Sequence, residues 1–391
     1  MTGRELHCGF LPLVDCASLA IAKEIGFAAE ENIDLVLHKE PNWSLIREKL
    51  TIGALDAALV LSPMPIAASL GLGGVAKRID VLSVASVNGN VIGVGPQLAD
   101  QLFRAGIDWK FGDPRSIGEA LKKIVHKKIQ IGVPFPFSMH KELVLYWLES
   151  IGFDVETKLD IRTVPPSMMA NAIENNEIDA FCVGEPWGSI TVERCQAQLI
   201  LPGTAIWALA PEKVLAARNS WIAENFDKAG GLFRATWRAA KWLSNPVNLV
   251  TASEILSRPN YVNVPAGVID RALTGRLVTE QSGLEAQTPR FLEFFAAQAR
   301  FPWRSQAIWI ADRLALRHGL DRTTAWRIAR DCFRADLYRE FIEPLGEDTP
   351  GASEKVEGLL TSATPVGSAK GRITLGPDHF FDGRTFDPER V

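Results

Sequence analysis

The chemistry open to this chain begins with side chains that can donate hydrogen bonds to a small anion. His140 follows a Pro-Phe-Pro-Phe-Ser-Met sequence, and Ser138 is a suitable N-cap that would place the imidazole in a helix's first turn. Free N–H groups at a helix start favour an anion, and the imidazole adds a directed donor. Trp43 stands in a Pro-Asn-Trp-Ser loop, where its indole N–H can donate while the ring excludes water. Asn88 and Asn90 flank a glycine and offer side-chain amides, so the set predicts a small-anion site.

Each of these residues also has a purely structural interpretation. His140 could belong to a capping region that faces solvent, and Trp43 could be a partly buried loop aromatic. Asn-Gly is a common tight-turn sequence, so Asn88 and Asn90 could serve the turn alone. The anion interpretation requires a fold that brings these side chains together.

Two stretches of the chain, residues 44–63 and 167–186, share one pattern of residue types. Each contains a serine, apolar helix positions, an Asp-Ala pair, a buried-strand run and a closing proline. We expect each stretch to form a helix capped by its serine (Ser44 or Ser167), a turn and a buried strand. Two similar α/β halves usually face each other across a cleft, and α/β sheets hold ligands at strand carboxyl ends. The repeat therefore predicts two lobes with a ligand site between them.

The two copies agree at one acidic position and differ at another. Asp56 and Asp179 are equivalent, so we expect both to bond backbone amides at a turn. Glu185 stands where the first copy has Ser62. We therefore expect Glu185 to line the cleft or the hinge, and Trp187 to pack at the hinge.

The order of elements predicts an α/β fold. A β-α-β-α-β order implies a parallel sheet with right-handed crossovers, and the alternation restarts after residue 90. After residue 210 the pattern becomes helical, beginning with a helix over 211–224. The expected strands are 5–13, 33–37, 56–61, 81–85, 91–94, 129–133, 160–163, 179–183, 198–201 and 205–209, and the expected helices between them are 15–29, 44–52, 116–125, 138–150 and 167–175.

A chain of 391 residues should divide into two or three compact units. We expect residues 1–90 together with 187–345 to form the first lobe and its additional C-terminal helices. Residues 91–186 should form the second lobe. Residues 346–391 are expected to be an ordered extension laid over a surface, because isolated apolar residues interrupt their Gly, Pro and Ser.

The composition suits an ordinary globular protein, with 47% hydrophobic and 23% charged residues. A net charge of −4 argues against a protein that coats nucleic acid. Five cysteines, without a CxxC pair, are expected to be reduced thiols in the cytoplasm. The first twenty residues contain no apolar run typical of an export signal, and no run is long enough to cross a bilayer. We therefore expect a cytoplasmic protein with no membrane partner.

Sequence signals for catalysis are absent. The chain has no Walker A, GxSxG or HExxH motif, and its glycine clusters at 71–74 and 89–95 do not have dinucleotide-binding spacing. The six histidines are scattered, and no pair has the spacing of metal ligands. We expect no catalytic residues, no cofactor and no metal.

Several sequence strings together resemble the nitrate/bicarbonate solute-binding family of ABC importers over about residues 5–340. The resemblance implies a two-lobed type II periplasmic-binding-protein-like fold. The matching strings are Gly9–Leu13, Ala22–Phe27, Trp43–Ser44, Ser62–Pro65, Asn88–Asn90, Asp179–Trp187, Pro211–Lys213 and Tyr261–Pro265.

The resemblance also implies which residues hold the anion. The family's tryptophan falls on Trp43 and its histidine on His140, whereas its glutamine falls on the shorter amide of Asn90. The lysine of nitrate importers falls on Ala208, and Ala208 does not match the acidic residue of the calcium-dependent bicarbonate members either. The anion would then be held by neutral donors, helix starts and a protonated His140.

The closing residues 375–383 resemble those of soluble sensors of bacterial nitrate assimilation. This resemblance implies a cytoplasmic nitrate or nitrite sensor that sequesters an RNA-binding antiterminator and releases it when the anion binds, with no direct contact to nucleic acid. The alternative is a solute-binding component of a nitrate, sulfonate or bicarbonate importer. A third class, an enzyme on the same scaffold, would need a nucleophile–base pair that the sequence does not offer.

Overall fold

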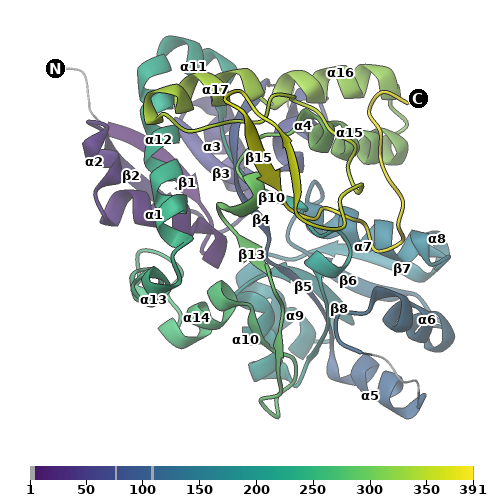
Figure 1. Ribbon diagram of the computed structural model, residues 1–391. Helices are drawn as coiled ribbons and strands as arrows, with labels where there is room; N and C mark the ends of the chain where they lie inside the picture. The colour runs from purple at the N-terminus through teal and green to yellow at the C-terminus, as the bar shows by residue number, and fades with distance from the viewer. Residues whose placement is uncertain (1–4, 75–76, 107–109, 391) are drawn as a thin grey trace.

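The computed structural model describes residues 5–74, 77–106 and 110–390, so the first four residues of the predicted first lobe lie outside it. Within these residues the two largest sheets have six and five strands, and each of them is the centre of a lobe (Figure 1). The predicted two-lobed α/β class is confirmed. No helix in the described ranges is both long and apolar enough to span a membrane.

The first lobe is built on the six-stranded sheet. Its first three strands along the chain pair in parallel, as the alternation predicts, whereas β10 (Pro211–Arg218) and β13 (Leu292–Glu293) run antiparallel to their neighbours. In spatial order the strands are β13 (Leu292–Glu293), β4 (Ile79–Asn88), β10 (Pro211–Arg218), β3 (Ala57–Leu61), β1 (Glu5–Phe10) and β2 (Asp34–Lys39).

The second lobe is built on the five-stranded sheet. Its last strand, β9, pairs with β5, so the chain leaves this lobe only after Pro202 and not at the expected residue 187. In spatial order the strands are β7 (Leu159–Thr163), β6 (Ile129–Val133), β8 (Ala180–Gly184), β5 (Asn90–Val94) and β9 (Gln198–Pro202).

Strand β10 corrects the expected helix over 211–224. Residues 211–218 lie between β3 and β4, and all but the last are buried. Only residues 219–224 form the expected kind of element, a short helix α11 (Asn219–Glu224). The sequence Pro-Glu-Lys-Val-Leu-Ala-Ala suits a helix locally, and pairing with two apolar strands overrides that preference.

The predicted repeat is present in both lobes. Strands β3 and β8 keep the offset of 123, since 180 − 57 and 184 − 61 are both 123. Asp56 accepts from the amide of His7 at 2.9 Å, and Asp179 accepts from the amide of Gln130 at 2.8 Å. The two aspartates therefore bond the backbone of the neighbouring parallel strand, which confirms their shared structural role.

The helix preceding each repeated strand begins differently from the prediction. Helix α3 (Trp43–Ile52) is capped by Asn42, whose side chain accepts from Leu45, and not by Ser44. In the second copy a short 3₁₀ turn (Pro166–Met168) precedes α9 (Met169–Glu174), and Ser167 makes no capping bond. The earlier start of α3 makes Trp43 its first residue.

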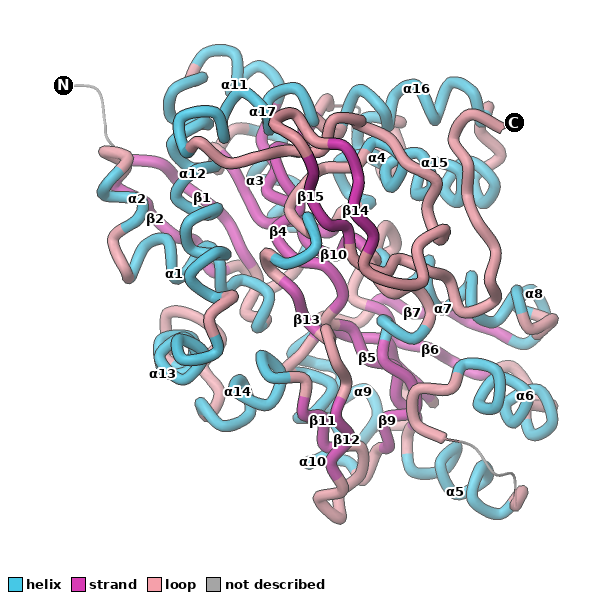
Figure 2. The backbone as a smooth tube through the Cα atoms, in the orientation of Figure 1, coloured by secondary structure: helices cyan, strands magenta, loops and turns pink. Residues whose placement is uncertain are grey.

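Helices cover both sheets and extend the first lobe (Figures 1 and 2). In the first lobe α1 packs against α12 and α13, and α4 packs against α15 and α16. The remaining helices are α1 (Ala17–Glu24), α2 (Phe27–Glu30), α4 (Pro63–Ser69), α5 (Pro96–Arg104), α6 (Pro114–Ile124), α7 (Met139–Ser150), α8 (Val155–Lys158), α10 (Trp187–Cys195), α12 (Phe226–Leu243), α13 (Leu249–Ser257), α14 (Ala266–Thr274), α15 (Arg304–His318), α16 (Arg322–Cys332) and α17 (Ala335–Ile342).

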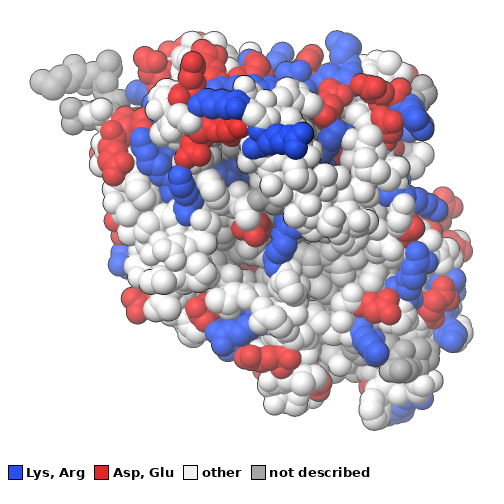
Figure 3. Space-filling model, viewed as in Figure 1, with Lys and Arg blue, Asp and Glu red and all other residues white. Residues whose placement is uncertain are grey.

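The last forty-five described residues, 346–390, form a segment with regular secondary structure. It contains the hairpin of β14 (Thr364–Gly367) and β15 (Arg372–Leu375); a second hairpin, β11 (Arg276–Val278) and β12 (Glu285–Gln287), lies earlier in the chain. Phe380 is buried. On the face shown in Figure 3, basic and acidic side chains are interspersed, and they are sparse across the middle of the molecule.

Candidate anion site between the lobes

Trp43, Asn90 and His140 come together where the lobes meet, each at the first or second residue of its element. Trp43 starts α3, Asn90 starts β5, and His140 is the second residue of α7. Ser138 caps α7 by accepting from the amide of Lys141, which confirms the predicted cap. All three side chains are no more than 2% exposed, and a buried Lys213 lies beside them.

Lys213 is the positive charge of this site. Its Nζ lies 2.8 Å from Asp15 Oδ2 and 2.9 Å from Glu212 Oε1. It also lies 5.3 Å from the centre of the Trp43 ring. Glu212 and Lys213 enter the site from strand β10, and Asp15 enters from a short 3₁₀ turn after β1.

Glu212 joins the two lobes. Its Oε2 accepts from Asn90 Nδ2 at 2.6 Å. Its Oε1 lies 3.3 Å from His140 Nδ1 without a hydrogen bond between them. Because His140 belongs to the second lobe and Glu212 to the first, this contact joins the two lobes.

Several buried polar atoms of the cluster have no hydrogen-bond partner among the described residues. They are Trp43 Nε1, Asn90 Oδ1 and both ring nitrogens of His140. Buried polar groups are normally paired, so a concentration of unpaired ones indicates a place for a polar ligand.

The titratable groups of the cluster respond differently to burial. Burial, with a smaller contribution from Lys213, lowers the pKa of His140 well below its usual value. Burial, together with the nearby Glu212 charge, raises the pKa of Asp15, and Lys213 opposes this only in part. Burial acts to lower the pKa of Lys213, but the two carboxylates outweigh it and the net shift is upward. Lys213 therefore carries the positive charge of the cluster, and burial disfavours the protonated form of His140 that the resemblance implies.

Asn88 and Glu185, the two other candidates, hold the hinge. Asn88 Nδ2 donates to the carbonyl oxygens of Ala208 and Arg290, and its Oδ1 accepts from the amide of Ala210. The Glu185 carboxylate accepts from the amide of Ser189, and burial raises its pKa to about 7. Their role as ligand contacts stays a prediction.

Two hydrogen bonds, one between main-chain groups and one from a side chain, link the two lobes at the hinge. The carbonyl of Glu185 accepts from the amide of Val14, and Trp187 Nε1 donates to the carbonyl of Pro12 at 2.9 Å. The expected packing of Trp187 at the hinge is confirmed.

Sequence reasoning missed Asp15, Glu212 and Lys213. The one local signal is the string Pro211–Lys213 followed by an apolar run, and this pattern is equally typical of a helix start. A helix over residues 211–218 would give no reason to expect Lys213 near Trp43.

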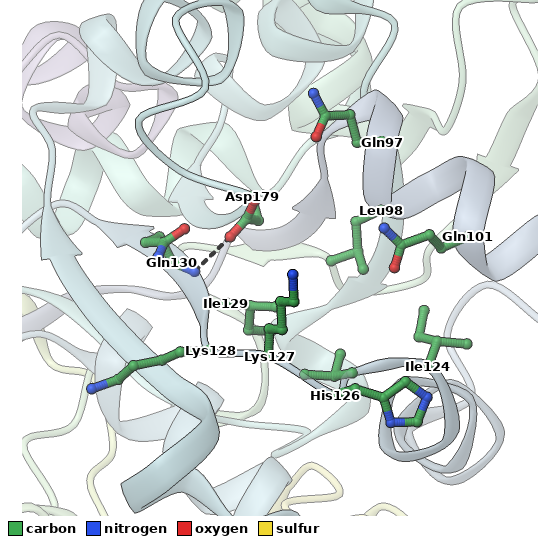
Figure 4. A pocket seen from close by; sticks show the side chains of 11 residues that line it. Gln97, Leu98, Gln101, Ile124, His126, Lys127, Lys128, Ile129, Gln130 and Asp179 are labelled. Carbon is green, nitrogen blue, oxygen red and sulfur yellow. Dashed lines mark hydrogen bonds between the residues drawn. The ribbon is translucent and has the colours of Figure 1, made fainter.

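A cavity of about 420 Å³ lies elsewhere in the second lobe (Figure 4). Its wall includes Gln97 and Lys127, with Asp179 at its back bonded to the amide of Gln130. None of the residues of the anion cluster lines it. No group of three or more metal-ligating side chains occurs in the ranges that the structure describes.

Comparisons with known proteins agree with this architecture. The sequence model of the NMT1-like family matches residues 2–257. The nitrate import ATP-binding protein NrtC of Synechocystis is 31% identical over 388 residues, which cover 96% of this chain but 56% of NrtC. The nitrate/nitrite binding protein NrtA of Nostoc is 28% identical over 390 residues, which cover 98% of this chain and 82% of that protein.

A solved structure extends the likeness to three dimensions. The crystal structure of the periplasmic nitrate-binding protein NrtA from Synechocystis superposes with a TM-score of 0.84 at 26% identity. The superposition covers 99% of this chain and 96% of that one. The likeness thus includes both lobes and the C-terminal segment.

Proposed function

Because this chain belongs to the NMT1-like family, we propose that it is a solute-binding protein that closes its two lobes on nitrate or nitrite. The observation that carries the proposal is the buried meeting of Trp43, Asn90 and His140 around Lys213. The nitrate-binding names of the relatives NrtA and NrtC support the choice of ligand.

The cluster offers a physical route to holding a monovalent oxyanion. Trp43 Nε1 and one ring nitrogen of His140 are donors without a partner, and nitrate oxygens only accept. Lys213 supplies a charge-assisted donor, which is worth about 1.5–3 kcal/mol. Asp15 and Glu212 occupy two of the three N–H donors of Lys213, which leaves one for the anion, and protonation of Asp15 would reduce the negative charge that opposes the anion.

A binding role without catalysis agrees with this chemistry. His140 is the histidine of the cluster; its Nδ1 lies 3.3 Å from the Glu212 carboxylate, and among the described residues neither ring nitrogen is hydrogen-bonded to a serine, threonine or cysteine that it could activate. The relatives compared above are named for binding and import.

Titration calorimetry tests the ligand. We expect nitrate to bind, and His140→Ala to weaken the affinity at least tenfold because a buried donor beside the anion is lost. His126→Ala is the matched control, because His126 is exposed on the second lobe and lies outside the cluster. Equal nitrate affinity in wild type and His140→Ala would contradict this site.

We further propose that the protein is a cytoplasmic sensor that sequesters an RNA-binding antiterminator and releases it when the anion binds. All five cysteines, each within the described ranges, are free and buried, which suits a reducing compartment. Lobe closure can control a partner only if that partner distinguishes open from closed protein. The regulator, and not this protein, would contact the RNA.

Co-purification with the antiterminator, with and without nitrate, tests the sensor role. We expect capture without nitrate and loss of capture at saturating nitrate. Retention of the regulator at saturating nitrate would contradict release.

The alternative is a binding component of an ABC importer, which the names of NrtA and NrtC favour. Cell fractionation separates the two, because an importer component must reach the periplasm. Stimulation of an importer's ATPase by the anion-loaded protein would favour the alternative.

A further inference from the structure

The C-terminal segment touches both lobes and the hinge within five residues, 378–382. Asp378 accepts from Lys355 Nζ, and thereby joins a buried group anchored to Ser305 at the start of α15 in the first lobe. At the other end, Asp382 accepts from the hydroxyl of Tyr146, a residue of α7 in the second lobe.

The middle of this stretch pairs with the chain that returns from the second lobe. The carbonyl of His379 accepts from the amide of Ala208, and the amide of Phe381 donates to the carbonyl of Ile206. Residues 206–208 are part of the connection between β9 and β10. The segment therefore contacts one of the chain crossings about which the lobes must move.

Phe380 fills a space between the lobes. Its ring lies 5.2 Å from that of Tyr146 in α7, 5.9 Å from that of Trp309 in α15, and 4.8 Å from that of Trp207. Phe380 is 3% exposed. In Figure 1 the yellow segment runs from the helices of the first lobe to α7 and back.

Helix α7 is the element that this arrangement holds. His140 and Tyr146 lie six positions apart on it, about 9 Å along the axis. The same helix is held by Arg317 of α15, which donates to Glu142 and Glu149. Opening the cleft would separate α7 from Glu212 and would also have to break these outer contacts.

We infer that residues 378–382 form a clasp that positions α7, and with it His140, against the first lobe. Tyr146, Phe380 and Asp382 are its positioning residues: they do not touch the anion but set how far the lobes stand apart without it. The effect on lobe spacing is independent of the ligand's identity, whereas the effect on affinity rests on the proposed function.

The test compares the full-length protein with two conservative variants, Tyr146→Phe and Asp382→Asn. Tyr146→Phe removes the hydroxyl that donates to Asp382, and Asp382→Asn replaces the charged acceptor by a neutral amide oxygen; each keeps the side-chain shape. Asp387→Asn is the matched control, because Asp387 lies in the same segment and its ion pair is to the exposed Arg390.

Spin labels on both lobes report the spacing. The native cysteines are buried, so labels can be placed selectively at Ile52→Cys in the first lobe and Phe103→Cys in the second, both exposed positions. In anion-free protein we expect a short distance from closed molecules and a longer one from open molecules. In either variant the ratio of long to short distances should grow relative to the control, by about tenfold in Tyr146→Phe. The double variant should open no further than Tyr146→Phe alone, because that single variant already removes the whole bond.

Nitrate binding provides the second readout. We expect the variants to weaken nitrate affinity by up to about tenfold, mainly through faster dissociation. Unchanged distances in both variants overturn the clasp, and so does a lowered melting temperature without a distance change. If the distances change but no protein in the series binds nitrate, the clasp stands and the proposed ligand fails.

Discussion

Two buried groups in this molecule each contain one lysine, one aspartate and one glutamate, but they differ in how many neighbouring polar atoms lack a hydrogen-bond partner. The inner group joins Lys213 to Asp15 and Glu212 beneath Trp43, and the outer group joins Lys355 to Glu357 and Asp378 beneath Trp303. In both, one lysine serves two carboxylates, and burial raises the pKa of one of them, Asp15 or Glu357.

The outer group is complete. Each of its four carboxylate oxygens accepts a hydrogen bond, from Lys355, from Ser305 or from the amide of Leu360. The inner group leaves His140 and Asn90 Oδ1 unpaired. The indole nitrogens of both tryptophans lack partners, so this feature does not distinguish the groups.

The unpaired polar atoms of the inner group indicate where a ligand would bind. A closed set of partners stabilises one arrangement, as the outer group does for the C-terminal segment. An open set that spans two lobes can be completed by an anion, and completion then favours closure.

Replacing each lysine by methionine should have the largest effects on the two groups. Lys213→Met and Lys355→Met both leave two buried carboxylates without their cation, so each should lower the free energy of unfolding by about 3–5 kcal/mol. Denaturant titration measures this cost. Only Lys213→Met should abolish nitrate binding in calorimetry, and Lys355→Met should weaken it no more than the clasp variants. Equal nitrate affinity after loss of Lys213 would remove the inner group from the site.

Acid should affect the inner group through His140. Because burial lowers its pKa, folded protein binds fewer protons than unfolded protein below the usual value of 6.5, and stability falls as the pH drops. At pH 5 the loss is at most about 2 kcal/mol. His140→Asn should abolish this part of the dependence. Glu185 acts in the opposite direction, since its pKa is raised to about 7, so the readout is the difference between wild type and variant in melts at pH 5 and 7.

Nitrate affinity should rise as the pH falls through the raised pKa of Asp15. Protonated Asp15 no longer competes for Lys213 and makes the cluster less negative, so one proton is taken up with the anion. The nitrate affinity should change by at most about tenfold per pH unit, which corresponds to about 1.4 kcal/mol of binding free energy. Calorimetry between pH 5 and 8 should show this slope, and Asp15→Asn should flatten it. A slope that survives in Asp15→Asn would point to a different proton acceptor.

The smallest expected difference separates the two tryptophans. Trp43→Phe removes one donor and should weaken nitrate binding by about 0.5–1.5 kcal/mol, roughly three- to tenfold. Trp303→Phe makes the same chemical change beside Lys355 and should leave the affinity within twofold of the wild type. Identical losses in both variants would mean that Trp43 acts through general packing.

Much of the fold could be predicted because local patterns encode it. The repeat offset placed Asp56 and Asp179 correctly, and the Ser138 cap placed His140 in the first turn of α7. The return from the second lobe was expected too early because the pairing of β9 with β5 joins residues about a hundred positions apart. Such pairings have no local signature.

Local patterns in the sequence are sufficient to predict two similar lobes and to place three donors, Trp43, Asn90 and His140, at the starts of their elements. The position of these donors around Lys213 depends on the tertiary structure. That placement requires β10 to lie between β3 and β4, and the same residues could equally have begun a helix. Side-chain periodicity selects a type of element and a buried face, whereas the choice of neighbours depends on packing across the whole lobe.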